Sequence, residues 1–219
     1  MIRQVVQCLA DWPSVFDLLR WILEGAYHGH KSVIRNELAS RSRQVLDIGC
    51  GTGFYAQFFR PDAYIGVDLS PVYIAAARRK HPQYNFLVAN ACQLPFDANQ
   101  FSTAMISGVL HHLPDDEAER ALAEAARVLS TDGQLVVWED IPSIAWWNAV
   151  GPLIHHLDLG RCIRHRDRYR SLVERHFTIR SERLMRSGFM DYVVFACSPR
   201  TPDINASQQS SHHAPRDEP

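Results

Sequence analysis

The chain has 219 residues, a formal net charge of −1, and a composition that is 46% hydrophobic and 21% charged. This length suits one α/β domain with a sizeable core, and the near-neutral charge gives no indication of a nucleic-acid binder. No apolar run approaches the roughly 18–20 residues that a membrane-spanning helix needs. The N-terminal residues also lack the clean apolar stretch of a signal peptide.

The five cysteines are widely spaced and include no C-x-x-C pair. Such spacing, with an odd number of cysteines, favours a reducing compartment and argues against a zinc site or a disulfide framework. We therefore expect a cytoplasmic protein with no structural metal.

Two helices are predicted before the first strand, over residues 14–25 and 31–38. The first is amphipathic, because its apolar side chains fall on one face: Val15, Leu18, Leu19 and Ile22. The connection between the helices contains Gly25 and Gly29, which suit a tight helix–helix corner.

Strands and helices then alternate, which predicts a parallel sheet, and the apolar strands predict one that is covered on both faces. The expected strands lie near residues 45–48, 63–67, 85–89, 101–107 and 134–139. The expected helices lie near residues 54–59, 71–80 and 116–129. Beyond these, the pattern predicts a helix over 166–175 and a hairpin of strands over 176–183 and 191–197.

The most informative segment is Val45-Leu46-Asp47-Ile48-Gly49-Cys50-Gly51-Thr52-Gly53. Glycines at every second position let a ligand approach the backbone, because glycine has no Cβ and tolerates positive φ. A helix that follows such a turn directs free N–H groups toward the ligand. The spacing is G-x-G-x-G and departs from the dinucleotide motif G-x-G-x-x-G, since Phe54 stands at the last glycine position.

A second acid, Asp68, lies 19 positions beyond Gly49, at the end of the second expected strand. A carboxylate in this place can accept hydrogen bonds from both hydroxyls of a ribose. The alternative role is a helix cap, but Ser70 as N-cap and Pro71 at the first helical position already fill it.

Five segments in order resemble the class I S-adenosylmethionine-dependent methyltransferases, and most closely the small-molecule subgroup that includes quinone-pathway enzymes. The similar segments are residues 45–56, Tyr64-Ile65-Gly66-Val67-Asp68-Leu69-Ser70, residues 86–96, residues 101–114 with Val109-Leu110-His111-His112-Leu113-Pro114, and residues 127–135. A lone glycine loop would be a weak signal, whereas five motifs in order are a strong one.

The resemblance implies a Rossmann-like three-layer α/β sandwich with a mostly parallel seven-stranded sheet and an antiparallel C-terminal edge. It also implies a division of the chain into a helical lid (residues 1–40) and an S-adenosylmethionine-binding domain (residues 41–198). The last segment, residues 199–219, is rich in Pro, Ser, Gln and Asp, and we expect it to be disordered.

The resemblance further implies a set of cofactor-binding residues: Asp47, Gly49, Gly51, Gly53, Asp68, Leu69, Asn90, Ala91, Ser107 and Tyr27. Asp47 would lie on the methionine side of the cofactor, and its alternative role is a buried carboxylate that pairs with loop amides. Asn90 replaces an acid that usually faces the adenine amino group, but it keeps an acceptor oxygen. Tyr27 would bond the cofactor carboxylate from a lid, unless its segment is an ordinary helix corner.

His111 and His112 follow the fourth strand directly and lie near the expected methyl acceptor. Histidine is the commonest general base, so both are candidates, with His112 slightly preferred. The alternative is that one of them only holds the loop by hydrogen bonds.

The segment after residue 139 carries aromatic and basic side chains, among them Trp146, Trp147, His155, His156 and Asp158, followed by Arg161, Arg164, Arg166, Arg168 and Arg170. Flat apolar surface and arginines suit an aromatic or lipid-like acceptor with an anionic group. The alternative is a core-packing Trp pair and a solvated arginine face.

The leading hypothesis is therefore a methyltransferase that uses S-adenosylmethionine on a small-molecule acceptor, with no nucleic-acid partner. The alternatives are a cofactor-binding scaffold without turnover and a nicotinamide-dependent oxidoreductase. An RNA methyltransferase would be expected to add a basic domain or a known catalytic motif. Peripheral membrane contact is compatible with a quinone-like acceptor, and the oligomeric state stays open.

Overall fold

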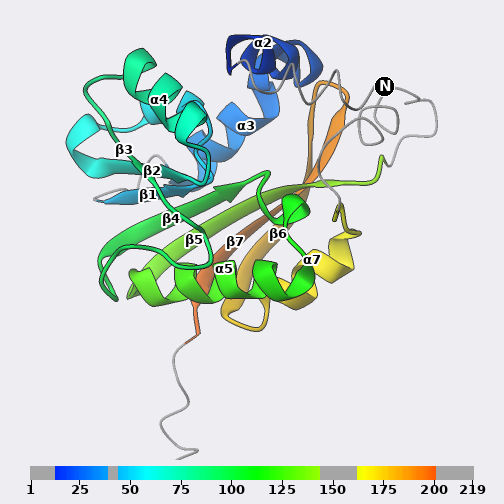
Figure 1. The fold of residues 1–219 in the computed structure, drawn as a ribbon. Coiled ribbons are helices and arrows are strands. Elements are labelled where there is room, and N and C mark those ends of the chain that lie inside the picture. Colours follow the sequence, from blue (N-terminus) through cyan, green and yellow to red (C-terminus); the bar gives the residue numbers. More distant parts are fainter. Residues whose placement is uncertain (1–12, 39–43, 144–161, 201–219) are drawn as a thin grey trace, which may run out of the picture.

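The computed structural model describes residues 13–38, 44–143 and 162–200. Seven strands form one mixed sheet in the order β3-β2-β1-β4-β5-β7-β6 (Figure 1). Their bounds are β1 Val45–Ile48, β2 Tyr64–Asp68, β3 Asn85–Val88, β4 Phe101–Ser107, β5 Leu129–Ile141, β6 Phe177–Ser187 and β7 Met190–Pro199. The first five strands pair in parallel, and β7 runs antiparallel to both β5 and β6. The predicted fold class is confirmed.

The strand order reverses between β1 and β4. The chain builds outward from β1 to β2 and β3, then returns to place β4 on the other side of β1. The connections that follow these two central strands therefore diverge and leave a crevice at the carboxyl edge of the sheet, where open α/β sheets bind ligands.

Helices cover both faces of the sheet (Figure 1). One face carries α2 (Pro13–Leu23), α3 (His28–Val33) and α4 (Pro71–Lys80), and the other carries α5 (Asp115–Val128) and α7 (Arg166–Val173). Side chains alternate along each strand, so β1 contributes to two cores: Leu46 and Ile48 pack on the α5 side and Val45 packs on the α4 side. One core on each face of the sheet gives the three layers, which are helices, sheet and helices.

Local sequence signals account for several element boundaries. Ser70 accepts a hydrogen bond from the Tyr73 N–H (3.3 Å) and Pro71 begins α4, as the capping pattern predicts. The helix expected over 54–59 is only a 3₁₀ segment, Phe54–Phe58, because Phe59 is already extended ahead of Pro61.

Two further boundaries differ from the prediction. The second helix starts early, at His28, and its last turn, Ile34–Leu38, is a π-helix. The fifth strand is assigned from Leu129, because that residue already pairs with Phe101 before a register shift. The predicted lid is described from residue 13 onward, and the predicted tail only as far as residue 200.

The first two helices are joined by a left-handed turn. Gly25, Ala26 and Tyr27 have φ values of 55°, 55° and 58°. The β6–β7 turn holds this corner, because the Phe189 N–H donates to the Leu23 carbonyl at 3.0 Å. A Cβ on Gly188, whose φ is +58°, would lie 2.1 Å from the same oxygen. The position of the first helix therefore depends on a glycine far away in the sequence.

We predict that Gly188→Ala lowers the free energy of unfolding by about 1–3 kcal/mol, because it combines an unfavourable φ with a steric clash. Urea unfolding monitored by circular dichroism measures the change. Gly51→Ala is the matched control, since its φ is similar (+54°) but no atom lies within 4 Å of the added Cβ. Equal losses in the two variants would contradict the proposed clash.

Candidate cofactor and active site

The glycine loop after β1 is held against β2 by two backbone hydrogen bonds. The N–H groups of Gly49 and Cys50 both donate to the Val67 carbonyl, at 2.8 and 2.9 Å. Gly49, Gly51 and Gly53 all have positive φ, at 79°, 54° and 77°. The loop therefore adopts a conformation that other residues rarely take at three alternate positions.

The three glycines serve two purposes. A Cβ on Gly49 would meet Val109 at 2.1 Å, and one on Gly53 would meet Phe86 at 2.7 Å, so both positions are required for packing. At Gly51 nothing lies within 4 Å of such an atom. Gly51 thus leaves open space above the backbone, where a ligand can approach closely.

Asp68 joins the loops that follow β1 and β2. Its Oδ2 accepts from the Gly51 N–H at 2.9 Å, and its Oδ1 accepts from the Ser70 N–H at 2.8 Å. Burial raises the pKa of Asp68 above its ordinary value, and the bonds from Ser70 and Gly51 oppose this shift. Since each carboxyl oxygen has two lone pairs, both can accept one further hydrogen bond.

An exposed apolar surface lies next to Asp68. Leu69 is 69% exposed and Val88 is 49% exposed, and the Ala89 N–H donates to the Asp68 carbonyl at 3.0 Å, which brings the ends of β2 and β3 together. Asn90 is exposed, and its Oδ1 accepts from the Cys92 N–H at 2.9 Å. The structure thus brings these predicted residues to one edge of the sheet, with Ala91 half-buried behind them.

Asp47 lies beneath the glycine loop and is fully buried. The Tyr64 hydroxyl donates to its Oδ2 at 2.6 Å, while its Oδ1 has no hydrogen-bond partner within the described part of the chain. Burial raises the pKa of Asp47 to about 7, despite the bond from Tyr64. The bond to Asp47 comes from a tyrosine hydroxyl on β2, whereas the sequence suggested loop amides.

A buried carboxylate, Glu139, organises the turn after β4. Its Oε1 accepts from the N–H groups of Val109 (2.9 Å) and Leu110 (2.8 Å), and its Oε2 lies 2.9 Å from Nδ1 of His111. This contact makes Nδ1 the protonated ring nitrogen and leaves the lone pair of the imidazole on Nε2. Glu139 therefore fixes both the turn and the orientation of His111.

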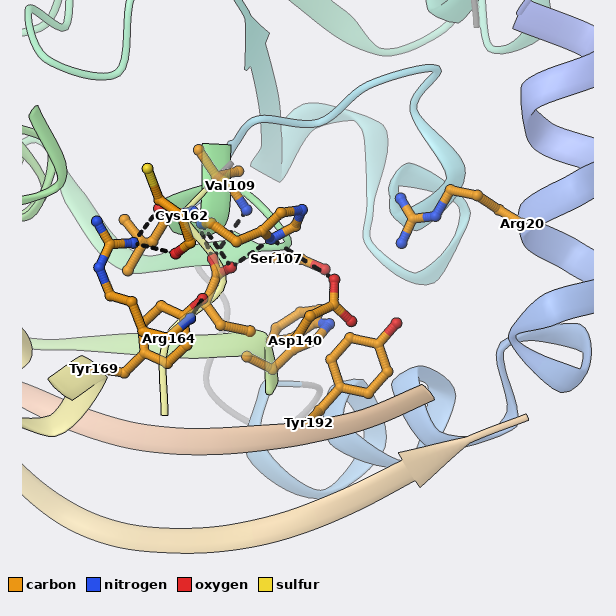
Figure 2. Close-up of polar contacts among 12 residues, drawn as sticks. Arg20, Ser107, Val109, Asp140, Cys162, Arg164, Tyr169 and Tyr192 are labelled. Carbon is orange, nitrogen blue, oxygen red and sulfur yellow. Dashed lines mark hydrogen bonds and ion pairs between the residues drawn. The ribbon is translucent and has the colours of Figure 1, made fainter. Parts of the chain in front are cut away.

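The same turn is held from its other side by Arg164. The guanidinium of Arg164 donates to the carbonyls of Leu110 and Leu113, each at 2.6 Å, and to Asp115 at 2.7 Å. Figure 2 shows Arg164 next to Tyr169 and Cys162 on one side of this cluster, with Asp140 and Tyr192 on the other. The turn is thus rigid before any ligand binds.

The two histidines differ in their surroundings. His111 is buried against Glu139, with Asp140 3.7 Å from its Nδ1, whereas His112 is exposed. Their rings lie 4.0 Å apart. The structure thus places the carboxylate of Glu139 against the ring of His111.

The inward face of α2 carries a polar stripe. Thr52 of the glycine loop donates to Asp17 at 2.6 Å, and Arg20 donates to Glu24 at 2.8 Å. Burial alone would raise the pKa of Glu24, but the Arg20 guanidinium and His30 hold it well below its usual range. The helix α2 therefore contacts the glycine loop through a charged side chain, that of Asp17.

Buried His30 connects this stripe to β4. Its Nδ1 accepts from the Trp138 indole N–H at 3.0 Å and lies 2.6 Å from the Tyr55 hydroxyl, which in turn lies 3.1 Å from Ser107 Oγ. Its Nε2 pairs with Glu24. Ser107, a predicted cofactor residue, is thus part of a buried polar network that reaches the lid.

Tyr27 is buried between aromatic side chains, with its ring 4.1 Å from that of Phe54 and the Arg20 guanidinium 5.6 Å from its centroid. Burial raises the pKa of Tyr27 to about 12, so the hydroxyl stays protonated. A cavity of about 350 Å³ lies beside it, lined by Asp17, Leu18, Trp21, Tyr27, Phe54 and Lys80.

Only part of the predicted acceptor wall lies within the described residues. Trp146, Trp147, His155, His156, Asp158 and Arg161 lie outside the described residues. The described arginines pair within the domain: Arg164 and Arg168 with Asp115, and Arg166 and Arg170 with Glu182. Each of these four arginines therefore has an acidic partner within the domain, and Arg164 is buried.

Sequence reasoning missed Arg20, Glu24, Tyr55 and Glu139. Arg20 and Glu24 could have been recognised from the sequence, because they lie four positions apart on the helix face opposite the apolar face. Glu139 is the last residue of the fifth expected strand, and no local pattern assigns it a role.

The segment over residues 45–133 matches the family described as "Methyltransferase domain". Together with the glycine loop, Asp68 and the seven-stranded topology, this match supports a class I S-adenosylmethionine-dependent methyltransferase. Members of the family use S-adenosylmethionine as methyl donor.

Two curated relatives and one solved structure illustrate the likeness. Demethylmenaquinone methyltransferase of Thermus thermophilus is 33% identical over 137 residues, which cover 58% of this chain and 61% of that protein. Probable tRNA methyltransferase 9B of Mus musculus is 35% identical over 95 residues, which cover 43% and 21% of the two chains. The PH0226 protein of Pyrococcus horikoshii superimposes with a TM-score of 0.64 at 18% identity, over 82% of this chain and 93% of that one. The matches thus cover less than two thirds of the curated relatives.

The residues at this methyltransferase site fit S-adenosylmethionine. Open space at Gly51 admits a ligand close to the backbone, Asp68 retains acceptor capacity for ribose hydroxyls, and exposed Leu69 offers apolar surface to a flat ring.

The described residues contain no helix long and apolar enough to cross a membrane.

We predict that Asp47 makes folding stability fall as pH rises. Its folded pKa of about 7 lies above its ordinary value of 3.8, so the folded state holds an extra proton between these values. Wild type should lose on the order of 2–4 kcal/mol more than Asp47→Asn between about pH 5 and pH 8, measured by urea unfolding. The Asn oxygen can still accept from Tyr64. Parallel pH profiles for the two proteins would show that Asp47 is ionised throughout.

Proposed function

We propose that this methyltransferase transfers a methyl group from S-adenosylmethionine to a small apolar or aromatic molecule, with His111 as general base. One observation carries the proposal: the glycine loop and the His111 turn are packed together, since Gly49 leaves room for Val109 of that turn. A cofactor on the open loop and a base on the turn would therefore lie on the same crevice.

Bound S-adenosylmethionine would supply a methyl group already activated on a sulfonium. In our proposal Asp68 accepts the ribose hydroxyls, while Leu69 and the Asn90–Ala91 backbone border the adenine. Gly51 allows close approach of the methionine portion. Buried Asp47 supports the loop from beneath through Tyr64. With an activated leaving group, the protein chiefly aligns the acceptor and excludes water.

His111 would take the proton that a hydroxyl or activated carbon of the acceptor loses as the methyl group arrives. Its Nε2 is the basic atom, because Nδ1 faces Glu139 at 2.9 Å. Glu139 acts as a positioning residue, and its negative charge stabilises the imidazolium formed by this proton transfer. His112 is exposed, whereas His111 is buried against Glu139.

The acceptor class is inferred from the lining of the site. The cavity next to the glycine loop is bordered by Trp21, Tyr27 and Phe54, which favour flat apolar molecules. The Thermus relative, by its name, methylates demethylmenaquinone, a comparison that supports this choice. The acceptor needs no anionic group, because Arg164, Arg166, Arg168 and Arg170 already have acidic partners.

Transfer to RNA is the second candidate, favoured by the name of the mouse relative. A net charge of −1 argues against it, since phosphate contacts require clustered cations. A scaffold without turnover would keep the glycine loop and Asp68 but would have no use for an oriented His111.

We predict that Asp68→Ala weakens S-adenosylmethionine binding by about 1.5–3 kcal/mol, the range for hydrogen bonds to a charged group. Calorimetric titration measures the affinity. Asp68→Asn is the control for loop structure, because the amide keeps one acceptor for a backbone N–H, and it should lose less. An unchanged affinity in the alanine variant would remove Asp68 from the ribose site.

We predict that His111→Ala lowers turnover by about 10²–10⁴, as expected when a general base is lost. The acceptor for this assay comes from a screen of phenols and reduced quinones. S-adenosylmethionine affinity should stay close to wild type, which separates a chemical defect from a folding defect. His112→Ala is the neighbouring control with a few-fold effect. If His112→Ala causes the larger loss, the assignment of the base is wrong.

A further inference from the structure

The first described helix, α2, presents its apolar side chains to solvent and its polar side chains to the protein. Asp17 on α2 and Glu24, directly after α2, face the protein, where they pair with Thr52 and His30. The large apolar residues of α2 point to solvent: Leu18 is 57% exposed, Trp21 52% and Ile22 54%. A surface helix normally buries its apolar stripe, so this orientation requires an explanation.

The exposed apolar residues form one patch. Leu18 lies three and four positions before Trp21 and Ile22, and Leu19 lies three positions before Ile22, so the side chains in each of these pairs are neighbours on the helix. Phe189, 42% exposed, extends the patch, because its N–H is bonded to the Leu23 carbonyl at the end of α2. Contiguous apolar patches of this kind mark interaction sites.

The ion pairs around the patch share one orientation, with the cation outside and the acid inside. The Arg186 side chain is 41% exposed and its partner Asp191 5%. Lys80 is likewise more exposed than its partner Asp17. The border of the patch therefore presents positive charge to its surroundings.

We propose that α2 and the Phe189 turn dock this protein onto an anionic lipid membrane surface. An apolar helix face with a tryptophan and a cationic border is the composition that binds lipid interfaces. A symmetric contact with a second copy is disfavoured, because it would place the same exposed cations opposite one another.

The patch also adjoins the cavity beside the glycine loop, since Leu18 and Trp21 border both. An apolar acceptor dissolved in the bilayer would then reach the site without crossing water. This last step rests on the proposed function, whereas membrane docking itself does not.

Sedimentation with lipid vesicles tests the docking. The full chain should bind vesicles of phosphatidylcholine with phosphatidylglycerol more strongly than vesicles of phosphatidylcholine alone, and less strongly at high salt. The double variant L18Q/I22Q should lower the partition coefficient about tenfold or more, because it removes two apolar anchors. Since both side chains are exposed, we expect the variant to fold, and its circular dichroism spectrum and urea unfolding midpoint verify this.

Leu184→Gln is the matched control. Leu184 is 49% exposed on β6, and strand alternation places it on the opposite sheet face from Met185, which packs against Gly29. It should bind vesicles like wild type. Failure of wild type to bind anionic vesicles, or equal binding by L18Q/I22Q, overturns the proposal, and so does a dimer in analytical ultracentrifugation that L18Q/I22Q dissociates. Methyl transfer is not needed for any of these outcomes.

Discussion

The site depends on one carboxylate, that of Asp68, which holds two loops in a fixed relation. It accepts one N–H from the glycine loop after β1 and one from the start of α4 after β2. Both loops begin at the carboxyl ends of parallel strands, where the chain leaves the sheet and would otherwise be free to vary. Because Asp68 keeps lone pairs for a ligand, the group that organises the loops can also bind the cofactor.

A second carboxylate has the corresponding role on the other side of the crevice. Glu139, at the end of β5, bonds the backbone of the turn after β4 and orients His111. Glu24 connects the lid to the same region through His30 and Tyr55. These acids are buried, so their hydrogen bonds are strong and costly to break. The site is thus preorganised around acids that are far apart in the sequence, and the charges hold α2 in place while its apolar face stays outward.

Much of the fold was predictable because its signals are local. The strand positions, the Ser70–Pro71 start of α4 and the three glycines follow from patterns a few residues long. Contacts between distant segments were not predictable. No local pattern places Glu139 against His111, 28 positions earlier. Periodicity likewise identified an apolar face on α2 but not its direction, since the orientation depends on partners such as Thr52 and Tyr192. The preference for His112 over His111 was uncertain for the same reason.

Calorimetric titration of the 219-residue wild-type chain with S-adenosylmethionine and, separately, with NADH tests the central claim most directly. We expect saturable binding of S-adenosylmethionine and none of NADH, because in the proposed site Gly51 and Asp68 bind a nucleoside, while Phe54 replaces the third glycine of the dinucleotide motif. Binding of NADH without binding of S-adenosylmethionine would contradict the assignment of the site.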